Sequence, residues 1–228
     1  MDTSLFEVAD GAWVRHAPLR FMGLFELGTR MTVLRAGDGL VVHSPVPITA
    51  ELKAAVDALG PVRFVVAPSL YHHMFVASAT DAWPDARLLA PAALRKKRPD
   101  LRIDADLEAG APSAWDGTLE LFPIRGSMLG ETALYHRSSK TLVGADLFEN
   151  FTHVEHGLTR GYLKLGGVYG KPGWHRLLRS VYRDRKAARA SIETLLALDL
   201  ENIVIAHGDI VTARARETLQ EALAFLLR

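Results

Sequence analysis

The sequence predicts an α/β or α+β protein in which mixed β-sheets are covered on the outside by helices. Short apolar runs separated by turn residues fill much of the first 145 residues, which is typical of strands. Apolar residues at helical spacing dominate from about residue 174 to residue 198. The order is a β-rich start, β–α units, a β-rich middle, helices, one strand and a last helix. Sheets with helices packed on their faces satisfy this order.

The first hundred residues are expected to form four strands and then two β–α units. The strands are expected at 6–8, 12–15, 31–35 and 40–43, with a turn at 36–39. A helix should begin after Thr49, a plausible N-cap, and end at Gly60. Its buried stripe should comprise Leu52, Ala55, Val56 and Leu59. An apolar strand at 63–67 follows, and the second strand–helix unit covers 87–90 and 91–97.

The remainder of the chain alternates between predicted strands and predicted helices. Three strands are expected at 119–123, 132–136 and 141–145. Two helices should then bury the apolar stripes Trp174, Leu177, Leu178, Val181 and Ala188, Ile192, Leu195, Leu196. A buried strand at 202–206 precedes a closing helix that carries Leu219, Ala222, Leu223 and Leu226.

Length and composition exclude several classes of protein. The 228 residues, 49% of them hydrophobic, are expected to form one domain, 1–228, with a substantial core. The chain has no cysteine, so any metal must be bound by His, Asp or Glu. Residues 1–5 lack the basic start and apolar run of a signal peptide, and no apolar stretch approaches the roughly 20 residues of a membrane span. We therefore expect a cytoplasmic protein without a transmembrane segment.

Polar residues stand just past the carboxyl ends of three predicted strands. The three segments are residues 65–75, which include His72, residues 141–148, which include Asp146, and residues 203–209, which include His207. Side chains at strand ends converge on a shared edge, where ligands and catalytic groups tend to lie. These segments are therefore the first candidates for a functional site.

In order and spacing, the three segments resemble the metallo-β-lactamase superfamily over nearly the whole chain. That family has an HxHxDH motif after a strand, a GHT-like segment in mid-chain, an Asp after a further strand and a final His in a GHG-like turn. The sequence is similar to a degenerate branch of the superfamily that has no assigned function. The resemblance implies an αββα sandwich of the metallo-β-lactamase type, with two mixed sheets flanked by helices.

The sequence departs from this family at most of the family's metal ligands. His72 matches the middle His of HxHxDH, Asp146 matches the bridging Asp, and His207 matches the last His. At four other ligand positions of the family, this sequence has Leu70, Met74, Phe75 and Ser127. The resemblance implies no metal or one divalent metal, Zn²⁺ or Fe²⁺, held by the three matching residues. In the family's two-metal site, the histidines that match His72 and His207 bind different metals. One ion held by both residues here would therefore lie away from both of the family's metal positions.

Each of these residues also has a purely structural interpretation. His72 and His207 can donate to a carbonyl or to Asp146, and Asp146 can be the N-cap of a following helix. His73 is expected to be a surface or loop residue, because adjacent helical residues face different directions. His153 and His156 have a chelating i, i+3 spacing, but a solvated loop fits them better.

Residues 160–189 are strongly basic and carry nine Arg or Lys against Asp184 alone. Arg176, Arg179 and Arg183 are expected on one helical face, opposite the apolar stripe, as an anion-binding group. The alternatives are a solvated helix face, contact with nucleic acid, or contact with an acidic membrane surface. The preceding glycine-rich stretch is expected to be mobile and to serve as a lid.

Two classes of function follow from these observations. The first is a divergent hydrolase that acts on a small, anionic molecule with one metal or none. The second is a non-catalytic ligand-binding protein that kept the pocket and lost the chemistry. Nucleic-acid or anion binding through residues 160–189 is a third alternative. A small-molecule partner is favoured over nucleic acid, and a fold alone names no substrate.

Overall fold

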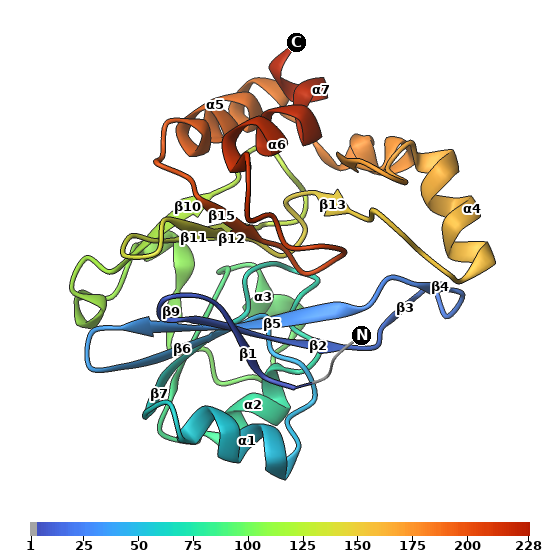
Figure 1. Ribbon diagram of the computed structural model, residues 1–228. Coiled ribbons are helices and arrows are strands. Elements are labelled where there is room, and N and C mark those ends of the chain that lie inside the picture. Colours follow the sequence, from blue (N-terminus) through green and yellow to red (C-terminus); the bar gives the residue numbers. More distant parts are fainter. Residues whose placement is uncertain (1–3) are drawn as a thin grey trace.

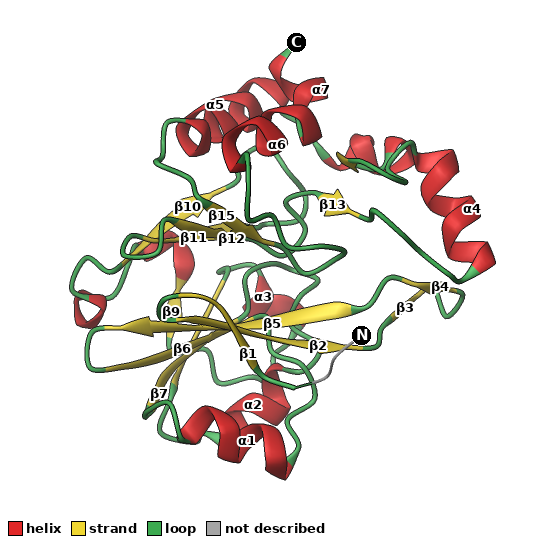
Figure 2. Ribbon diagram, in the orientation of Figure 1, coloured by secondary structure: helices red, strands yellow, loops and turns green. Residues whose placement is uncertain are grey.

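The computed structural model describes residues 4–228, which form four layers (Figure 1). Two β-sheets lie face to face in the middle, and helices cover the outer face of each sheet (Figure 2). This arrangement confirms the expected αββα sandwich. Residues 1–3, which belong to the expectation about a leader segment, lie outside the described residues. Within the described part, no helix is both long and apolar enough to cross a membrane.

The first sheet has seven strands in the order β1-β2-β5-β6-β7-β8-β9. Its strands are β1 (Phe6–Ala9), β2 (Ala12–Ala17), β5 (Thr29–Ala36), β6 (Gly39–His43), β7 (Val62–Val66), β8 (Arg87–Ala90) and β9 (Ala105–Asp106). Neighbours from β1 to β6 are antiparallel, and neighbours from β6 to β9 are parallel. The carboxyl ends of β6, β7 and β8 therefore lie at one edge.

The second sheet has four strands, β10 (Leu119–Pro123), β11 (Thr132–His136), β12 (Thr141–Val143) and β15 (Asn202–Val204). The pair β12–β15 is parallel, so these strands also end at one edge. Two small antiparallel pairs lie outside the main sheets: β3 (Arg20–Phe21) with β4 (Phe25–Glu26), and β13 (Glu149–Asn150) with β14 (Pro172–Gly173).

Helices α1 (Ala50–Asp57) and α2 (Val76–Ala82) cover the first sheet, and α5 (Arg185–Leu196), α6 (Ala215–Ala222) and α7 (Ala224–Leu227) cover the second (Figure 1). The other α-helices are α3 (Leu94–Lys97) and α4 (Gly157–Gly166). Three short 3₁₀ helices are η1 (Leu107–Ala109), η2 (Ser113–Trp115) and η3 (Arg176–Val181). The α4 helix stands at one side, next to β3 and β4 (Figure 1).

Apolar side chains form three core layers that alternate with the sheets. The layer between the sheets includes Val41, Val66, Leu134 and Val204. The layer under α1 and α2 includes Val42, Leu52, Val65 and Val76. The layer under the C-terminal helices includes Leu142, Ile192, Ile203 and Leu219. Neighbouring strand residues thus face different core layers, because side chains of a strand alternate between its two faces.

Several local expectations from the sequence are confirmed. The strands at 119–123 and 132–136 have the predicted bounds. Thr49 is the N-cap of α1, and its hydroxyl accepts a hydrogen bond from the Leu52 amide at 3.2 Å. The helix ends at Asp57 rather than at Gly60, and Ala55 is exposed instead of belonging to the buried stripe.

Other expectations are wrong. The segment 176–181 is a 3₁₀ helix, and Leu177 is 64% exposed instead of buried. Arg183 lies beyond the end of this helix and does not continue its face. Part of the glycine-rich stretch forms the regular helix α4. The element that comes next after Asp146 is the strand β13 and not a helix, so the interpretation of Asp146 as an N-cap is also wrong.

Candidate metal site

The loops that follow strands β7, β12 and β15 bring three side chains together at one edge of the sandwich. His72 Nε2 lies 3.2 Å from Asp146 Oδ1 and 3.3 Å from His207 Nε2. His207 Nε2 lies 3.4 Å from the same Asp146 oxygen. The three atoms therefore form a nearly equilateral triangle. In the part of the chain that the structure describes, no further His, Asp or Glu belongs to this group.

A backbone carbonyl fixes the tautomer of His207. Its Nδ1 lies 2.8 Å from the carbonyl oxygen of Gly28. A carbonyl only accepts hydrogen bonds, so Nδ1 carries the proton that is donated to it. The neutral ring then has a free electron pair on Nε2, the atom that faces His72 and Asp146. A carbonyl behind a histidine is a common partner of metal-binding histidines.

Two hydroxyl groups hold His72 in place. Ser44, at the end of β6, places its Oγ 2.8 Å from His72 Nδ1. A hydroxyl can accept as well as donate, so it can receive a proton from Nδ1 and leave the Nε2 electron pair free. Ser69, which is fully buried, accepts hydrogen bonds from the amides of Tyr71 and His72. The loop after β7 is therefore ordered by its own side chains.

The third residue, Asp146, is oriented through the backbone by a buried carboxyl group. Glu131 Oε1 accepts hydrogen bonds from the amides of Ala145 at 2.7 Å and Asp146 at 3.1 Å. Burial raises the pKa of Glu131 to about 8, and the negative charge of Asp146 adds to the shift. Burial also opposes ionisation of Asp146, but the charges and hydrogen bonds of His72 and His207 hold its pKa well below its usual range.

The size of the triangle fits a single zinc-sized cation. Ligand atoms at 2.0–2.1 Å from a tetrahedral Zn²⁺ lie about 3.3 Å from one another. The observed separations are 3.2, 3.3 and 3.4 Å. One ion can thus reach all three donors, with the fourth corner of the tetrahedron directed away from them. Two neutral imidazoles and one carboxylate also have the chemistry that Zn²⁺ and Fe²⁺ accept.

A further carboxyl group, Glu149 on β13, is buried close to the triangle. Its Oε2 is buried and has no hydrogen-bond partner among the described residues. Burial raises its pKa to about 7, the charge of His207 lowers it, and the charge of Asp146 raises it. The neighbouring residue Asn150 donates its amide to the carbonyl of His207 at 3.4 Å. Glu149 is therefore a buried carboxyl group with a raised pKa near the site, and no motif in the sequence indicated it.

The other candidate histidines do not join the triangle. His73 is buried, and its Nδ1 accepts a hydrogen bond from Arg98 at 3.1 Å. His156 is the N-cap of α4 and lies with His153 in the wall of a cavity of about 660 Å³. Gly28 and Gly208, which adjoin His207, also line this cavity. A space for a small molecule therefore borders the residues that hold His207.

The positions without ligand atoms lie in the same loops as the triangle or next to them. Leu70 packs against Gly130, Phe75 is the N-cap of α2, and Met74 is 47% exposed. Ser127 accepts a hydrogen bond from the amide of Leu129 at 3.2 Å. Leu70 and Phe75 have no atom that can bind a metal, and the hydroxyl of Ser127 is used by the backbone.

The three arginines that the sequence placed on one face are separated in the structure. Arg176 and Arg179 belong to η3, and the Arg179 guanidinium lies over the ring of Phe225. Arg183 instead directs its Nε to Met128 Sδ, at 3.2 Å. The expected row of three arginines is therefore wrong, because the helix that should present it ends at Val181.

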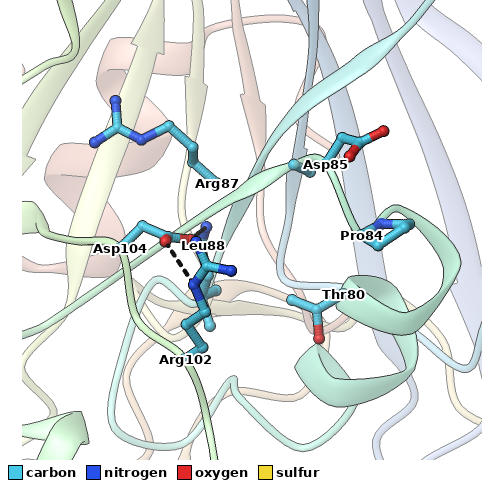
Figure 3. Close-up of a pocket in the computed structure, with 8 residues that line it drawn as sticks. Thr80, Pro84, Asp85, Arg87, Leu88, Arg102 and Asp104 are labelled. Carbon is cyan, nitrogen blue, oxygen red and sulfur yellow. Dashed lines mark hydrogen bonds and ion pairs between the residues drawn. The ribbon is translucent and has the colours of Figure 1, made fainter.

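A second cavity lies far along the first sheet from the triangle. It is lined by Thr80, Pro84, Asp85, Arg87, Leu88, Arg102 and Asp104, among others (Figure 3). These residues adjoin the start of β8, whereas the triangle lies where the parallel strands end. Arg102 pairs with Asp104 at 3.3 Å, and Asp104 also accepts the amide of Leu88. Two of the charges that line this cavity, Arg102 and Asp104, thus pair with each other.

Comparisons with known proteins agree with this fold. A model of a domain of unknown function, DUF4336, matches residues 22–93, and no curated protein matches the chain. A metallo-β-lactamase from Pontibacter korlensis is 15% identical with a TM-score of 0.69, over 98% of each chain. The mono-zinc form of FIM-1 from Pseudomonas aeruginosa is 15% identical with a TM-score of 0.66, over 98% of this chain and 94% of its own. The chain therefore has the metallo-β-lactamase fold.

Proposed function

We propose that this protein is a hydrolase that uses one divalent cation, Zn²⁺ or Fe²⁺, bound by His72, Asp146 and His207. The observation that carries the proposal is the triangle of donor atoms, whose edges of 3.2–3.4 Å match those around a single zinc ion. The mono-zinc form of FIM-1 from Pseudomonas aeruginosa, which shares the fold, supports a single ion on this scaffold.

The neighbouring residues support one ion rather than two. Leu70, Met74 and Phe75 have no charged or imidazole donor, and the hydroxyl of Ser127 accepts a backbone amide. Two divalent charges need more ligands than one carboxylate and two imidazoles provide. The proposed site therefore takes one ion per chain.

In this proposal the cation supplies positive charge that polarises a substrate oxygen. His207 and His72 keep their electron pairs directed inward, because Gly28 and Ser44 bind the other nitrogen of each ring. Glu149 accepts a proton from the attacking water at Oε2, the oxygen that has no partner within the described chain. The family that the sequence resembles has an acid–base aspartate at the position of Met74. In this proposal Glu149 takes over the role of that aspartate.

The substrate is proposed to be a small molecule. The cavity of about 660 Å³ beside Gly28 and Gly208 has room for one, and its wall includes His16, His153 and Arg20. The wall also carries Glu26, Glu155 and Asp209, and Arg20 pairs with Glu26 at 2.8 Å, so the charge of the substrate is left to experiment. Comparison of a neutral and an anionic ester therefore tests this part of the proposal.

Hydrolysis of p-nitrophenyl acetate and bis(p-nitrophenyl) phosphate tests the proposed function. Protein stripped with a chelator should be inactive and should recover turnover after one equivalent of Zn²⁺ or Fe²⁺. His72→Asn should abolish this recovery, whereas Glu217→Gln, an exposed carboxyl group on α6 that belongs neither to the triangle nor to the cavity wall, is the control and should keep it. Equal turnover of the stripped protein and of the metal-loaded protein would refute the proposal.

Glu149→Gln separates the chemistry from metal binding. A general base typically contributes a factor of about 10²–10⁴ to the rate, so kcat should fall at least about 100-fold. The affinity for the metal should stay within about threefold, because Glu149 is not one of the three donors. Unchanged kcat in this variant would remove Glu149 from the proposal.

A non-catalytic ligand-binding protein is the second candidate function. The observation that favours it is the group of exposed apolar residues in the loops around the site, Tyr71, Met74 and Met128, each about half exposed. Such residues suit the binding of an apolar ligand. This candidate predicts binding of one metal without turnover of either ester, and Glu149→Gln would then change nothing measurable.

A further inference from the structure

Four arginines gather on the outer helical layer, away from the metal site. Arg179 on η3 and Arg185 on α5 both lie over the ring of Phe225 on α7, with their guanidinium carbons 4.6 and 5.9 Å from its centre. Burial lowers the pKa of Arg179, and the positive charges of Arg176, Arg185 and Arg228 lower it further. These four residues, Arg176, Arg179, Arg185 and Arg228, are called the arginine cluster below.

The arginine cluster has no acidic partner among residues 4–228. Seven other arginines, by contrast, form ion pairs with Asp or Glu: Arg20, Arg63, Arg95, Arg98, Arg102, Arg137 and Arg189. The Nε of Arg179 is also buried without a hydrogen-bond partner. Like charges that lie close together repel, and an unpaired buried donor destabilises the fold. Such a cluster is stabilised when an anion binds to it.

The shape of the cluster favours a ligand with several negative charges. Its members come from three elements, and Arg176, Arg185 and Arg228 are exposed on the surface. A guanidinium pairs with a phosphate through two parallel hydrogen bonds, and a chain of phosphates can engage all four arginines at once. The ring of Phe225 lies under the guanidinium groups of Arg179 and Arg185 and beside Tyr182, so it holds these charges in place. Phosphates spaced along a flexible single strand match charges that come from separate elements.

We infer that the arginine cluster binds single-stranded nucleic acid through its phosphate groups. The inference is independent of the proposed hydrolase, because none of the four arginines belongs to the metal site. For single strands, the slope of log K against log salt concentration is about −0.7 per neutralised phosphate. Four contacts therefore give a slope of about −2.8. Between 50 and 200 mM salt, the affinity should fall about 50-fold.

Fluorescence anisotropy with a labelled 20-nucleotide single strand of mixed sequence tests the inference. Arg179→Gln with Arg185→Gln should weaken binding at least about tenfold at 50 mM salt and reduce the slope to about −1.4. Arg63→Gln with Arg137→Gln is the matched control, because it removes the same net charge from arginines that are paired elsewhere. This control should keep the wild-type slope.

A second variant guards against misfolding, since Arg179 is partly buried. Arg176→Gln with Arg185→Gln changes only exposed side chains and should give the same loss of affinity with an unchanged melting temperature. Equal binding by the wild type and by both cluster variants would overturn the inference. Binding to vesicles of anionic phospholipid without measurable binding to the oligonucleotide would also overturn it, because the ligand would then be a membrane surface.

Discussion

Histidine 43 should make the stability of the fold depend on pH. It ends β6, is 1% exposed, and neither ring nitrogen has a partner among the described residues. Burial and, to a smaller extent, the charge of His72 together lower its pKa from 6.5 to about 3. The unfolded chain therefore binds a proton at this residue more readily than the folded chain, so stability is complete above pH 6.5 and is lost as the pH falls toward 3.

The size of this effect follows from the two pKa values. At pH 7.5 the linkage contributes almost nothing, because both states are nearly unprotonated at His43. At pH 5.0 the unfolded side chain is about 97% protonated and the folded one about 1%. Proton binding at pH 5.0 favours the unfolded chain over the folded chain by a factor of about 30. This factor corresponds to about 2 kcal/mol of lost stability. The His43→Leu variant cannot bind this proton. Between pH 7.5 and pH 5.0, its free energy of unfolding should therefore fall by about 2 kcal/mol less than that of the wild type.

Urea unfolding at pH 7.5 and 5.0, in the presence of a chelator, measures the difference. At pH 7.5 the variant should be within about 1 kcal/mol of the wild type, because no hydrogen bond is removed. His153→Leu, on the exposed loop before α4, is the control and should follow the wild type at both pH values. If the wild type and His43→Leu lose the same stability between the two pH values, then His43 is not buried in its neutral form.

Three further variants test the hydrogen bond that holds His72, a close backbone contact at Gly126 and the exposure of Leu177 on the 3₁₀ helix η3. Ser44→Ala removes the partner of His72 Nδ1 and should weaken zinc binding about 10–100-fold in calorimetry while the fold remains intact; unchanged affinity would contradict this role. Gly126→Ala should lower the free energy of unfolding by about 1–3 kcal/mol, because φ is +75° and the new Cβ would lie 2.0 Å from the Asp184 carbonyl oxygen; an unchanged urea midpoint would show that the loop adjusts. Leu177→Gln should change stability by less than about 0.5 kcal/mol, since Leu177 is 64% exposed; a loss above 2 kcal/mol would restore its place in the core.

The strands were predictable because their signals are local. Strands at 119–123 and 132–136 appear with the predicted bounds, since apolar runs between turn residues suffice to define them. The spacing of apolar residues at 174–181 did not distinguish an α-helix from a 3₁₀ helix, because both bring residues i and i+3 to one side. The helix α4 was not predicted, because it contains several glycines and glycine has a low helix propensity. Stacking of Tyr162 between Phe25 and His175 anchors this helix, and the sequence does not show such contacts.

The site was predictable only in part, for a related reason. His72, Asp146 and His207 each follow a predicted strand. The order of the strands alone therefore brings these three side chains close to one another. Their supports depend on contacts between distant loops: Gly28 holds His207 across 179 residues of sequence, and Ser44 holds His72 across 28. Glu131 stands in the segment that resembles the GHT-like motif, but its hydrogen bonds to the Ala145 and Asp146 amides have no sequence signature. The proposed role of Glu149 rests on its burial without a partner among the described residues, which is a property of the fold.

Calorimetric titration of chelator-treated protein with Zn²⁺ tests the proposed single-metal site most directly. The triangle of His72, Asp146 and His207 predicts one ion per chain. It also predicts that His207→Asn or Asp146→Asn removes most of the binding, while His153→Asn leaves the stoichiometry at one. Two tightly bound ions per chain would show that ligands outside the triangle take part. No binding, or binding that survives the loss of His207, would contradict the proposed site.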